Sequence, residues 1–192
     1  MAASSHTGTR TVFKVFAFGN SELKMQPRVF LELCWCVSRA AEDGAILRAW
    51  YIQPINDNGR DVVMCMASPT IVKEWPDSAP MILQKGYRVL LPDSRAHGDS
   101  GGAIATYGLL EREDIHLWVN WLYSDKSSHC VYGFGESMGA ALVVQALAVE
   151  KRFCAIVANS AFSNFRAVAY DRVGYYVHLG RWFGQTVGRF TG

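Results

Sequence analysis

The most constraining feature of this sequence is the pentapeptide Gly135-Glu136-Ser137-Met138-Gly139, which joins a short β-prone run to an apolar helix-forming run. Val131 and Tyr132 lie just before it, and residues 138–149 are apolar almost throughout. A Gly-x-Ser-x-Gly turn holds its serine in strained backbone geometry, and the flanking glycines let the two chain segments pass without Cβ clashes. The pattern predicts that Ser137 is a nucleophile presented above a sheet edge.

The residue after this serine has a predicted role through its main chain. Because the helix begins here, the N–H of Met138 is expected to point at a developing oxyanion, with support from the positive end of the helix. A short pattern with three fixed positions also arises by chance, and a serine at a helix start is often only an N-cap. The strand before and the apolar helix after favour the nucleophile.

The remaining sequence alternates between strand and helix patterns. A Gly-containing connection between residues 31–38 and 45–52 predicts an antiparallel hairpin. Short apolar runs predict buried strands, and longer periodic runs predict helices. The expected strands are 62–66, 87–92, 130–133 and 153–159, and the expected helices are 109–123 and 138–149. This order predicts an α/β fold: a mostly parallel sheet with an antiparallel N-terminal hairpin and helices on both faces.

Chain length and charge limit the number of domains and the kinds of partner that this sequence can have. The 192 residues are half apolar, which predicts one domain, residues 1–192, with a real core. The 19 basic and 17 acidic residues give a net charge of +2 and form no basic stripe with interleaved aromatics, so nucleic acid is not an expected partner. Apolar runs at 12–18 and 29–37 are too short to span a bilayer.

Cysteine usage suggests a reducing setting. The five cysteines are odd in number, and Cys65, Cys130 and Cys154 lie in apolar runs, where a free thiol behaves as a small core residue. A cytoplasmic location fits this pattern. Cys34 and Cys36 share one strand face, which would suit a metal site, but no second Cys or His pair follows at a suitable distance, so core packing is the favoured interpretation.

Several segments in a characteristic order resemble the α/β-hydrolase superfamily, within it the serine-aminopeptidase and monoacylglycerol-lipase-like branch. The resemblance is clearest over residues 42–174. Its segments are Glu-Asp-Gly-Ala-Ile-Leu-Arg-Ala-Trp-Tyr, Gly-Tyr-Arg-Val-Leu-Leu-Pro-Asp-Ser-Arg-Ala-His-Gly-Asp-Ser-Gly-Gly, Thr-Tyr-Gly-Leu-Leu-Glu-Arg-Glu-Asp-Ile, Tyr-Gly-Phe-Gly-Glu-Ser-Met-Gly-Ala-Ala and Ala-Asn-Ser-Ala-Phe-Ser-Asn-Phe.

The resemblance implies a serine hydrolase that cleaves a small ester or amide through an acyl-enzyme on Ser137, with the Met138 N–H as an oxyanion donor and no cofactor or metal. In such proteins the loop that contains His97 is mainly architectural. His97 is also an unsuitable base because the family order is serine, then acid, then histidine.

The sequence departs from the family pattern after the strand at 62–66. There the family carries His-Gly and a loop that supplies the second oxyanion N–H, whereas this chain reads Met64-Cys65-Met66-Ala67-Ser68-Pro69-Thr70. Pro69 has no N–H to donate. The oxyanion hole is therefore expected to be half built.

A second departure follows the serine. Glu150, Asp171 and His178 are the only acids and histidine after Ser137, and the last two lie in a stretch whose pattern indicates a helical, cap-like or membrane-facing segment rather than loops after core strands. We therefore expect an incomplete domain in which the last strands and the triad acid and base are missing. Strand 153–159 would then be an exposed apolar edge, which predicts self-association. The alternative to a working hydrolase is a non-catalytic fragment or binding module that keeps the serine turn.

Overall fold

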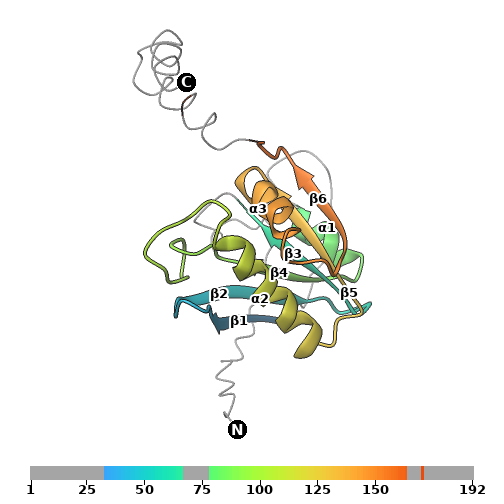
Figure 1. The fold of residues 1–192 in the computed structure, drawn as a ribbon. Helices are drawn as coiled ribbons and strands as arrows, with labels where there is room; N and C mark the ends of the chain where they lie inside the picture. Colours follow the sequence, from blue (N-terminus) through green and yellow to red (C-terminus); the bar gives the residue numbers. More distant parts are fainter. Residues whose placement is uncertain (1–32, 67–77, 164–169, 171–192) are drawn as a thin grey trace, which may run out of the picture.

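The computed structural model describes residues 33–66, 78–163 and 170 of the 192. Within them a single six-stranded sheet runs in the order β1-β2-β4-β3-β5-β6 (Figure 1). The elements are β1 (Leu33–Ala40), β2 (Ile46–Gln53), β3 (Arg60–Cys65), α1 (Ser78–Gln84), β4 (Arg88–Pro92), α2 (Glu111–Ser124), β5 (Cys130–Glu136), α3 (Met138–Ala146) and β6 (Phe153–Asn159). The N-terminal run at 12–18 lies outside the described residues.

The expected hairpin and parallel strands are confirmed. β1 and β2 pair antiparallel from Leu33 opposite Gln53 to Ala40 opposite Ile46, and β2 pairs antiparallel with β4. The β3–β4, β3–β5 and β5–β6 pairs are all parallel. The chain therefore has the α/β architecture that its alternating patterns predict.

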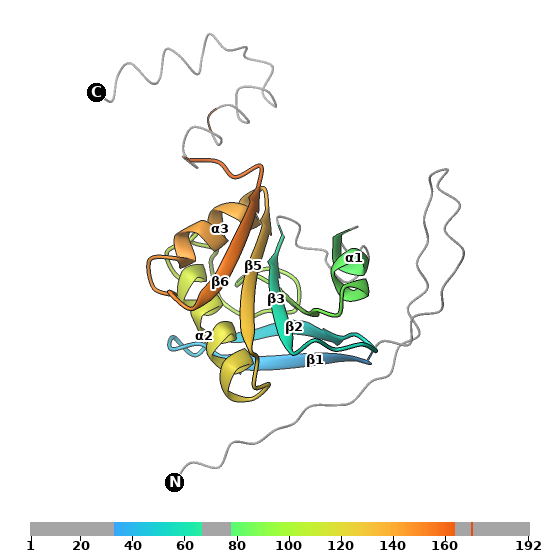
Figure 2. The same ribbon diagram turned by 90° about the vertical axis from the view of Figure 1, so that its right-hand side faces the viewer.

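Helices cover both faces of the sheet because successive strand residues point to opposite sides. Leu47, Val63 and Leu90 pack with α2 and α3 in one core cluster. Ile52, Val62 and Val89 pack with α1 in the other, which also contains Cys34. In Figure 2, α2 and α3 lie on one side of the strands and α1 on the other. This burial on two faces explains why β3 and β4 read as continuous apolar runs.

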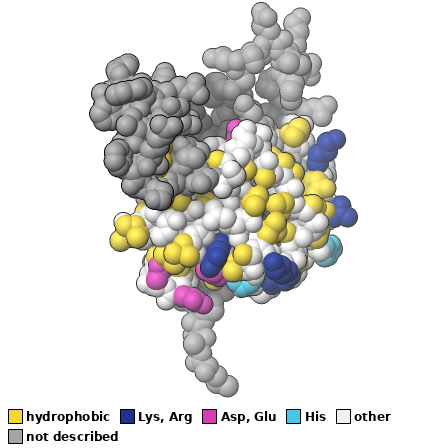
Figure 3. All heavy atoms as spheres, turned by 45° about the horizontal axis from the view of Figure 1, so that its top comes forward, with side chains coloured by type: hydrophobic (Ala, Val, Ile, Leu, Met, Phe, Trp, Pro, Cys, Tyr) yellow, Lys and Arg dark blue, Asp and Glu magenta, His cyan; other side chains and the backbone are white. Residues whose placement is uncertain are grey.

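Strand β6 forms one edge of the described sheet. Phe153 and Ile156 pack partly against the α2–α3 core cluster, while most other β6 side chains are exposed, including Val157 at 55%. Figure 3 shows hydrophobic side chains spread over the described part of one face, with basic side chains on its right-hand side and in its lower part. The segment 153–159 is therefore the edge strand of the sheet that the described residues form, and it contains no charged residue.

The cysteine interpretation needs one correction. Cys65 is buried and free, as expected, but Cys130 of β5 and Cys154 of β6 form a disulfide, with Cα atoms 6.0 Å apart. A bulge in the β5–β6 pairing leaves Cys154 without a register partner, and Cys154 is exposed because β6 lies at the edge. The apolar neighbours of Cys154 in the sequence predicted a free thiol in the core, and this prediction is wrong. Cys130 and Cys154 therefore no longer support the expectation of a reducing compartment.

None of the described helices combines the length and the apolar character that crossing a bilayer requires.

Candidate active site

The turn between β5 and α3 holds Ser137 in an unusual backbone conformation. Its φ is 54° and its ψ is −116°, a region that non-glycine residues rarely adopt. Such strain persists only where the surroundings enforce it, and it is concentrated at functional sites. Ser137 is also exposed, so its hydroxyl is accessible above the end of β5. The sharp strand-to-helix turn expected from the pentapeptide is present.

The two glycines of the pentapeptide make this turn sterically feasible. A Cβ at Gly135 would lie 2.6 Å from the main-chain nitrogen of Ala140, in the first turn of α3. A Cβ at Gly139 would overlap the carbonyl oxygen of Cys65 and lie 2.7 Å from the nitrogen of Met66. The start of α3 therefore packs directly on the end of β3, and neither position has room for a side chain.

Main-chain hydrogen bonds fix the turn on both sides. The N–H of Ser137 donates to the carbonyl oxygen of Asn159 at the end of β6 (2.9 Å), and the N–H of Ala141 donates to the carbonyl of Ser137 (3.3 Å). Met138 is the first residue of α3, where N–H groups have no acceptor within the helix. The turn thus places main-chain donors that have no acceptor within α3 beside the serine.

The loop after β4 is built around a buried carboxylate. Asp93 is 4% exposed and accepts a hydrogen bond from the N–H of Asp99 (2.9 Å), while Ser100 Oγ donates to the Asp93 carbonyl oxygen (2.8 Å). Gly98, with φ of 54°, lies so close to this carboxylate that a Cβ would clash with it. Burial raises the pKa of Asp93 despite the Asp99 hydrogen bond.

Arg95 ties the same loop to two other parts of the fold. It forms a two-pronged ion pair with Asp114 of α2, at 2.8 and 2.6 Å, and a third contact with Asp43 of the hairpin turn at 2.7 Å. These contacts raise the pKa of Arg95, the Asp114 hydrogen bonds most. Burial raises the pKa of Asp114, and the contact with Arg95 offsets this only in part. Arg95 therefore anchors the loop after β4 to α2 and to the hairpin turn.

Glu111 organises the segment that leads into α2. Its carboxylate accepts hydrogen bonds from the Thr106 N–H (2.7 Å), the Thr106 hydroxyl (2.6 Å) and the Gly108 N–H (2.7 Å). Burial alone would raise the pKa of Glu111, but these hydrogen bonds stabilise the carboxylate and leave the pKa below its usual value. Tyr107, between the donors, is held at a φ of 55°.

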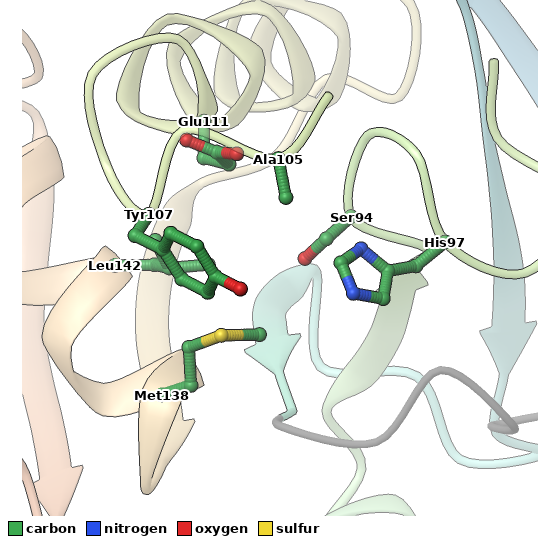
Figure 4. A pocket seen from close by; sticks show the side chains of 7 residues that line it. All are labelled: Ser94, His97, Ala105, Tyr107, Glu111, Met138 and Leu142. Atoms are coloured by element: carbon green, nitrogen blue, oxygen red, sulfur yellow. The ribbon is translucent and has the colours of Figure 1, made fainter. Parts of the chain in front are cut away.

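A shallow hollow lies between these loops and the start of α3; its empty space of about 170 Å³ includes open solvent, and a water molecule would not fit inside it. In Figure 4 the Tyr107 ring lies on one side above the Met138 side chain, with Ser94 and His97 facing it. The lining residues are Ser94, His97, Ala105, Tyr107, Glu111, Met138 and Leu142. Sequence reasoning gave no site role to Tyr107 or Glu111, although both stand in a segment that resembles the family.

The other residues that the sequence analysis considered for the site lie at various distances from Ser137 or outside the described residues. His97 is half-buried and faces the hollow, with Nδ1 2.9 Å from the Arg95 carbonyl oxygen. Glu150 lies beyond the C-terminal end of α3, whose nine residues separate it from Ser137 by about 13 Å along the helix axis. Asp171, His178 and Pro69 lie outside the described residues.

Glu150 is fully buried and already engaged. Its carboxylate accepts hydrogen bonds from Arg152 and lies 2.9 Å from Nδ1 of His116. Burial alone would raise the pKa of Glu150, but the Arg152 hydrogen bonds and charge lower it overall. Glu150 therefore fastens the connection between α3 and β6. Across the part of the chain that the structure describes, no three His, Cys, Asp or Glu side chains gather as metal ligands would.

Residues 62–190 match the family described as alpha/beta hydrolase fold, and this chain belongs to that family. Over 98 residues it is 30% identical to the uncharacterized protein YqkD of Bacillus subtilis (strain 168), a match covering 50% of this chain and 32% of YqkD.

Solved structures of the Pyrococcus furiosus esterase Pf2001 are also similar. One is 28% identical with a TM-score of 0.66 and covers 82% of this chain and 61% of its own. Another is 26% identical with a TM-score of 0.66 and covers 96% and 69%. An a/b serine hydrolase without lid from Xanthomonas campestris shares the fold at 17% identity, a TM-score of 0.52, and coverage of 61% and 56%. The chain spans 32% of YqkD and 50% to 69% of the Pf2001 chains.

Proposed function

We propose that this chain carries the nucleophile of a serine hydrolase that cleaves small esters through an acyl-enzyme on Ser137. The observation that carries the proposal is the strained Ser137 backbone, held between two glycines that have no room for a side chain. A solvent-exposed serine at a helix start is common as an N-cap. Ser137, however, makes no side-chain capping hydrogen bond, so its hydroxyl is not used for that purpose.

The proposed reaction is acyl transfer in two steps. Ser137 Oγ forms a bond to the ester carbonyl carbon while its proton passes to a general base, and the N–H of Met138 stabilises the oxyanion. The carbon–oxygen bond to the alcohol then breaks, and the alcohol leaves with a proton. Water attacks the acyl-enzyme, releases the carboxylic acid and restores the serine.

Similarity to a named esterase supports an ester over an amide substrate. The Pf2001 structure that is 28% identical to this chain is called an esterase. The segment from Asp93 to Gly102, together with the serine pentapeptide, supports a place in the serine-aminopeptidase and monoacylglycerol-lipase-like branch.

A second candidate is a non-catalytic module that keeps the turn without turnover. Within the described residues, no side chain hydrogen-bonds the hydroxyl of Ser137, so no base is seen engaged there. A serine without a base stays an ordinary alcohol, because nucleophile and base act as a unit.

Self-association through β6 is a further part of this proposal. The edge strand contains no charged residue or proline, and Val157 is largely exposed on it. Unpaired edges of this kind readily pair with another chain.

Labelling with a fluorophosphonate probe tests the function directly. We expect one probe adduct on the purified chain by intact mass, and its loss in Ser137→Ala. Ser160→Ala is the matched control, because Ser160 is also an exposed serine with a positive φ, 56°, but has no flanking glycines. A folded wild-type chain that stays unlabelled would favour the non-catalytic module.

A further inference from the structure

The Cys130–Cys154 disulfide closes a covalent loop around the serine turn. The two cysteines are 24 positions apart, and the chain between them contains β5, the Ser137 turn and α3. Cys130 is the first residue of β5 and Cys154 is the second of β6, so the bond joins the starts of two strands that lie side by side (Figure 2). A cross-link of this kind limits how far the segments that it joins can separate.

Strand β6 has few other attachments. It pairs with β5 on one side, at the edge of the described sheet, and of its side chains only Phe153 and Ile156 pack partly against the core. The hydrogen bonds from Arg152 to Glu150 fasten the connection before β6 and not the strand itself. Segments with few buried contacts are the first to open locally. We therefore expect the disulfide to supply much of the attachment of β6 at Cys154.

The position of the disulfide makes it accessible to a small reductant, since Cys154 is exposed and Cys130 is half-buried. The thiolate of a dithiol forms a bond to Cys154 Sγ, and Cys130 leaves as a thiolate that takes up a proton. The second sulfur of the dithiol then bonds to the first and releases the Cys154 thiolate, which is protonated in turn. Two electrons and two protons pass in total, which leaves two protein thiols and a cyclic disulfide.

The other three of the five cysteines are poorly placed to take over this reaction. Cys34 and Cys36 lie on β1, at the opposite edge of the sheet from β6. Cys65 lies opposite Gly135, near the other end of β5 from Cys130. Burial raises the pKa of the Cys65 thiol to about 12, so this sulfur stays protonated and is a poor nucleophile. Exchange at the disulfide is therefore expected with thiols from outside the chain.

We propose that the Cys130–Cys154 disulfide is a thiol-sensitive switch that sets how firmly β6 supports the Ser137 turn. In the oxidised chain the start of β6 is tied to β5, and at the far end of the strand the Asn159 carbonyl accepts the Ser137 N–H (2.9 Å). After reduction β6 opens more often, and the turn loses this support each time. The effect on reactivity rests on the proposed nucleophilic role of Ser137, whereas the effect on β6 does not.

Limited proteolysis of the full chain measures the opening of β6. The chain is digested briefly with subtilisin before and after treatment with dithiothreitol, and mass spectrometry compares cleavage within residues 153–159 with cleavage at the exposed residues 55–57. Reduction should raise this ratio by about tenfold, and oxidised glutathione should restore it. Cys130→Ser/Cys154→Ser should show the raised ratio with or without thiol, and Cys36→Ser should respond as wild type.

Alkylation and fluorophosphonate labelling of the same samples separate the outcomes. Alkylation should find two new thiols, Cys130 and Cys154, in the folded, reduced chain, and the labelling rate of Ser137 should fall. A disulfide that resists dithiothreitol until the chain unfolds, or an unchanged cleavage ratio once both thiols are alkylated, overturns the switch. A raised ratio with an unchanged labelling rate overturns the link to Ser137. A chain that is unlabelled in both states, yet shows the raised ratio, overturns the proposed function and leaves the opening of β6 standing.

Discussion

The carbonyl oxygen of Cys65, at the end of β3, occupies the place that a Cβ of Gly139 would need. Gly139 lies in α3 and not at a positive φ, so the restriction is purely spatial. We expect Gly139→Ala to lower the free energy of unfolding by about 1–3 kcal/mol, because overpacking displaces backbone. Labelling of Ser137 should fall as well, since α3 and the turn move together.

Chemical denaturation and probe labelling check this expectation. Gly44→Ala is the comparison, because Gly44 has a φ of 82° and no atom within 4 Å of an added Cβ. That variant should lose stability through backbone strain alone, about 1 kcal/mol, and keep its labelling. Full stability and labelling in Gly139→Ala would contradict close packing between the start of α3 and the end of β3.

The buried Arg95–Asp114 ion pair should contribute far more than an exposed one. Arg95→Met leaves the Asp114 carboxylate without its partner in a site where its side chain is 10% exposed. We expect a loss of about 3–5 kcal/mol in the free energy of unfolding. Arg39→Met removes a pair with Asp125 whose side chains are 29% and 30% exposed, and about 0–1 kcal/mol should be lost. Equal losses in urea denaturation would contradict the anchoring role of Arg95.

Glu111 should make stability depend on pH. Its pKa is lowered in the folded chain, so the unfolded state takes up a proton first as the pH falls. The stabilisation is therefore fully present above the unfolded pKa, about 4.3, and is lost as the pH falls through the lower folded pKa. Glu111→Gln should lower the free energy of unfolding at pH 7 by about 1.5–3 kcal/mol.

Unfolding curves from pH 7 to 3 measure this effect. The difference between wild type and Glu111→Gln should shrink below about pH 4.3. Glu113→Gln, on the exposed side of the same helical turn, should follow wild type at every pH. A constant difference for Glu111→Gln would mean that the carboxylate charge does not hold the Thr106–Gly108 segment.

The β6 edge predicts that the mass of the particle rises with protein concentration in light scattering. Val157→Lys places a charge on this strand and should return the chain to a monomer, as edge lysines do in natural sheets. Val144→Lys is matched, because Val144 is 44% exposed on α3 rather than on an edge. A wild-type monomer across the micromolar range would argue against association.

Much of the fold was predictable because apolar periodicity is local. The run at 153–159 matched β6 to the residue, and the helix expected at 109–123 was found at Glu111–Ser124. The sequence did not predict α1. This helix has only seven residues, with Pro80 near its start, which is too short for a recognisable helical periodicity. The strand order, with β4 between β2 and β3, is likewise not a local property.

The site was predictable only where one short segment specifies it. The serine turn needs glycines at fixed spacing, so Ser137 could be singled out. Glu111 and Asp114 lie in the first turn of α2, where acids are common on exposed surfaces because they suit the helix dipole, yet both are buried. Loop conformation brings Thr106 to Glu111 and Arg95 to Asp114. The apolar periodicity of a sequence does not predict loop conformation, so these contacts could not be foreseen. Cys154 was misread because a bulge at the sheet edge decides where its thiol points.

The hydrogen bond from the Ser137 N–H to the Asn159 carbonyl links a residue with strained backbone geometry to the end of the edge strand of the described sheet. Local unfolding of the end of β6 would break this hydrogen bond and expose the Ser137 N–H to solvent. Hydrogen exchange at Ser137 should therefore report the opening of β6 rather than that of α3, which begins at the next residue. A ligand or second chain that binds this edge would slow the exchange and make the Ser137 turn more rigid without contacting it.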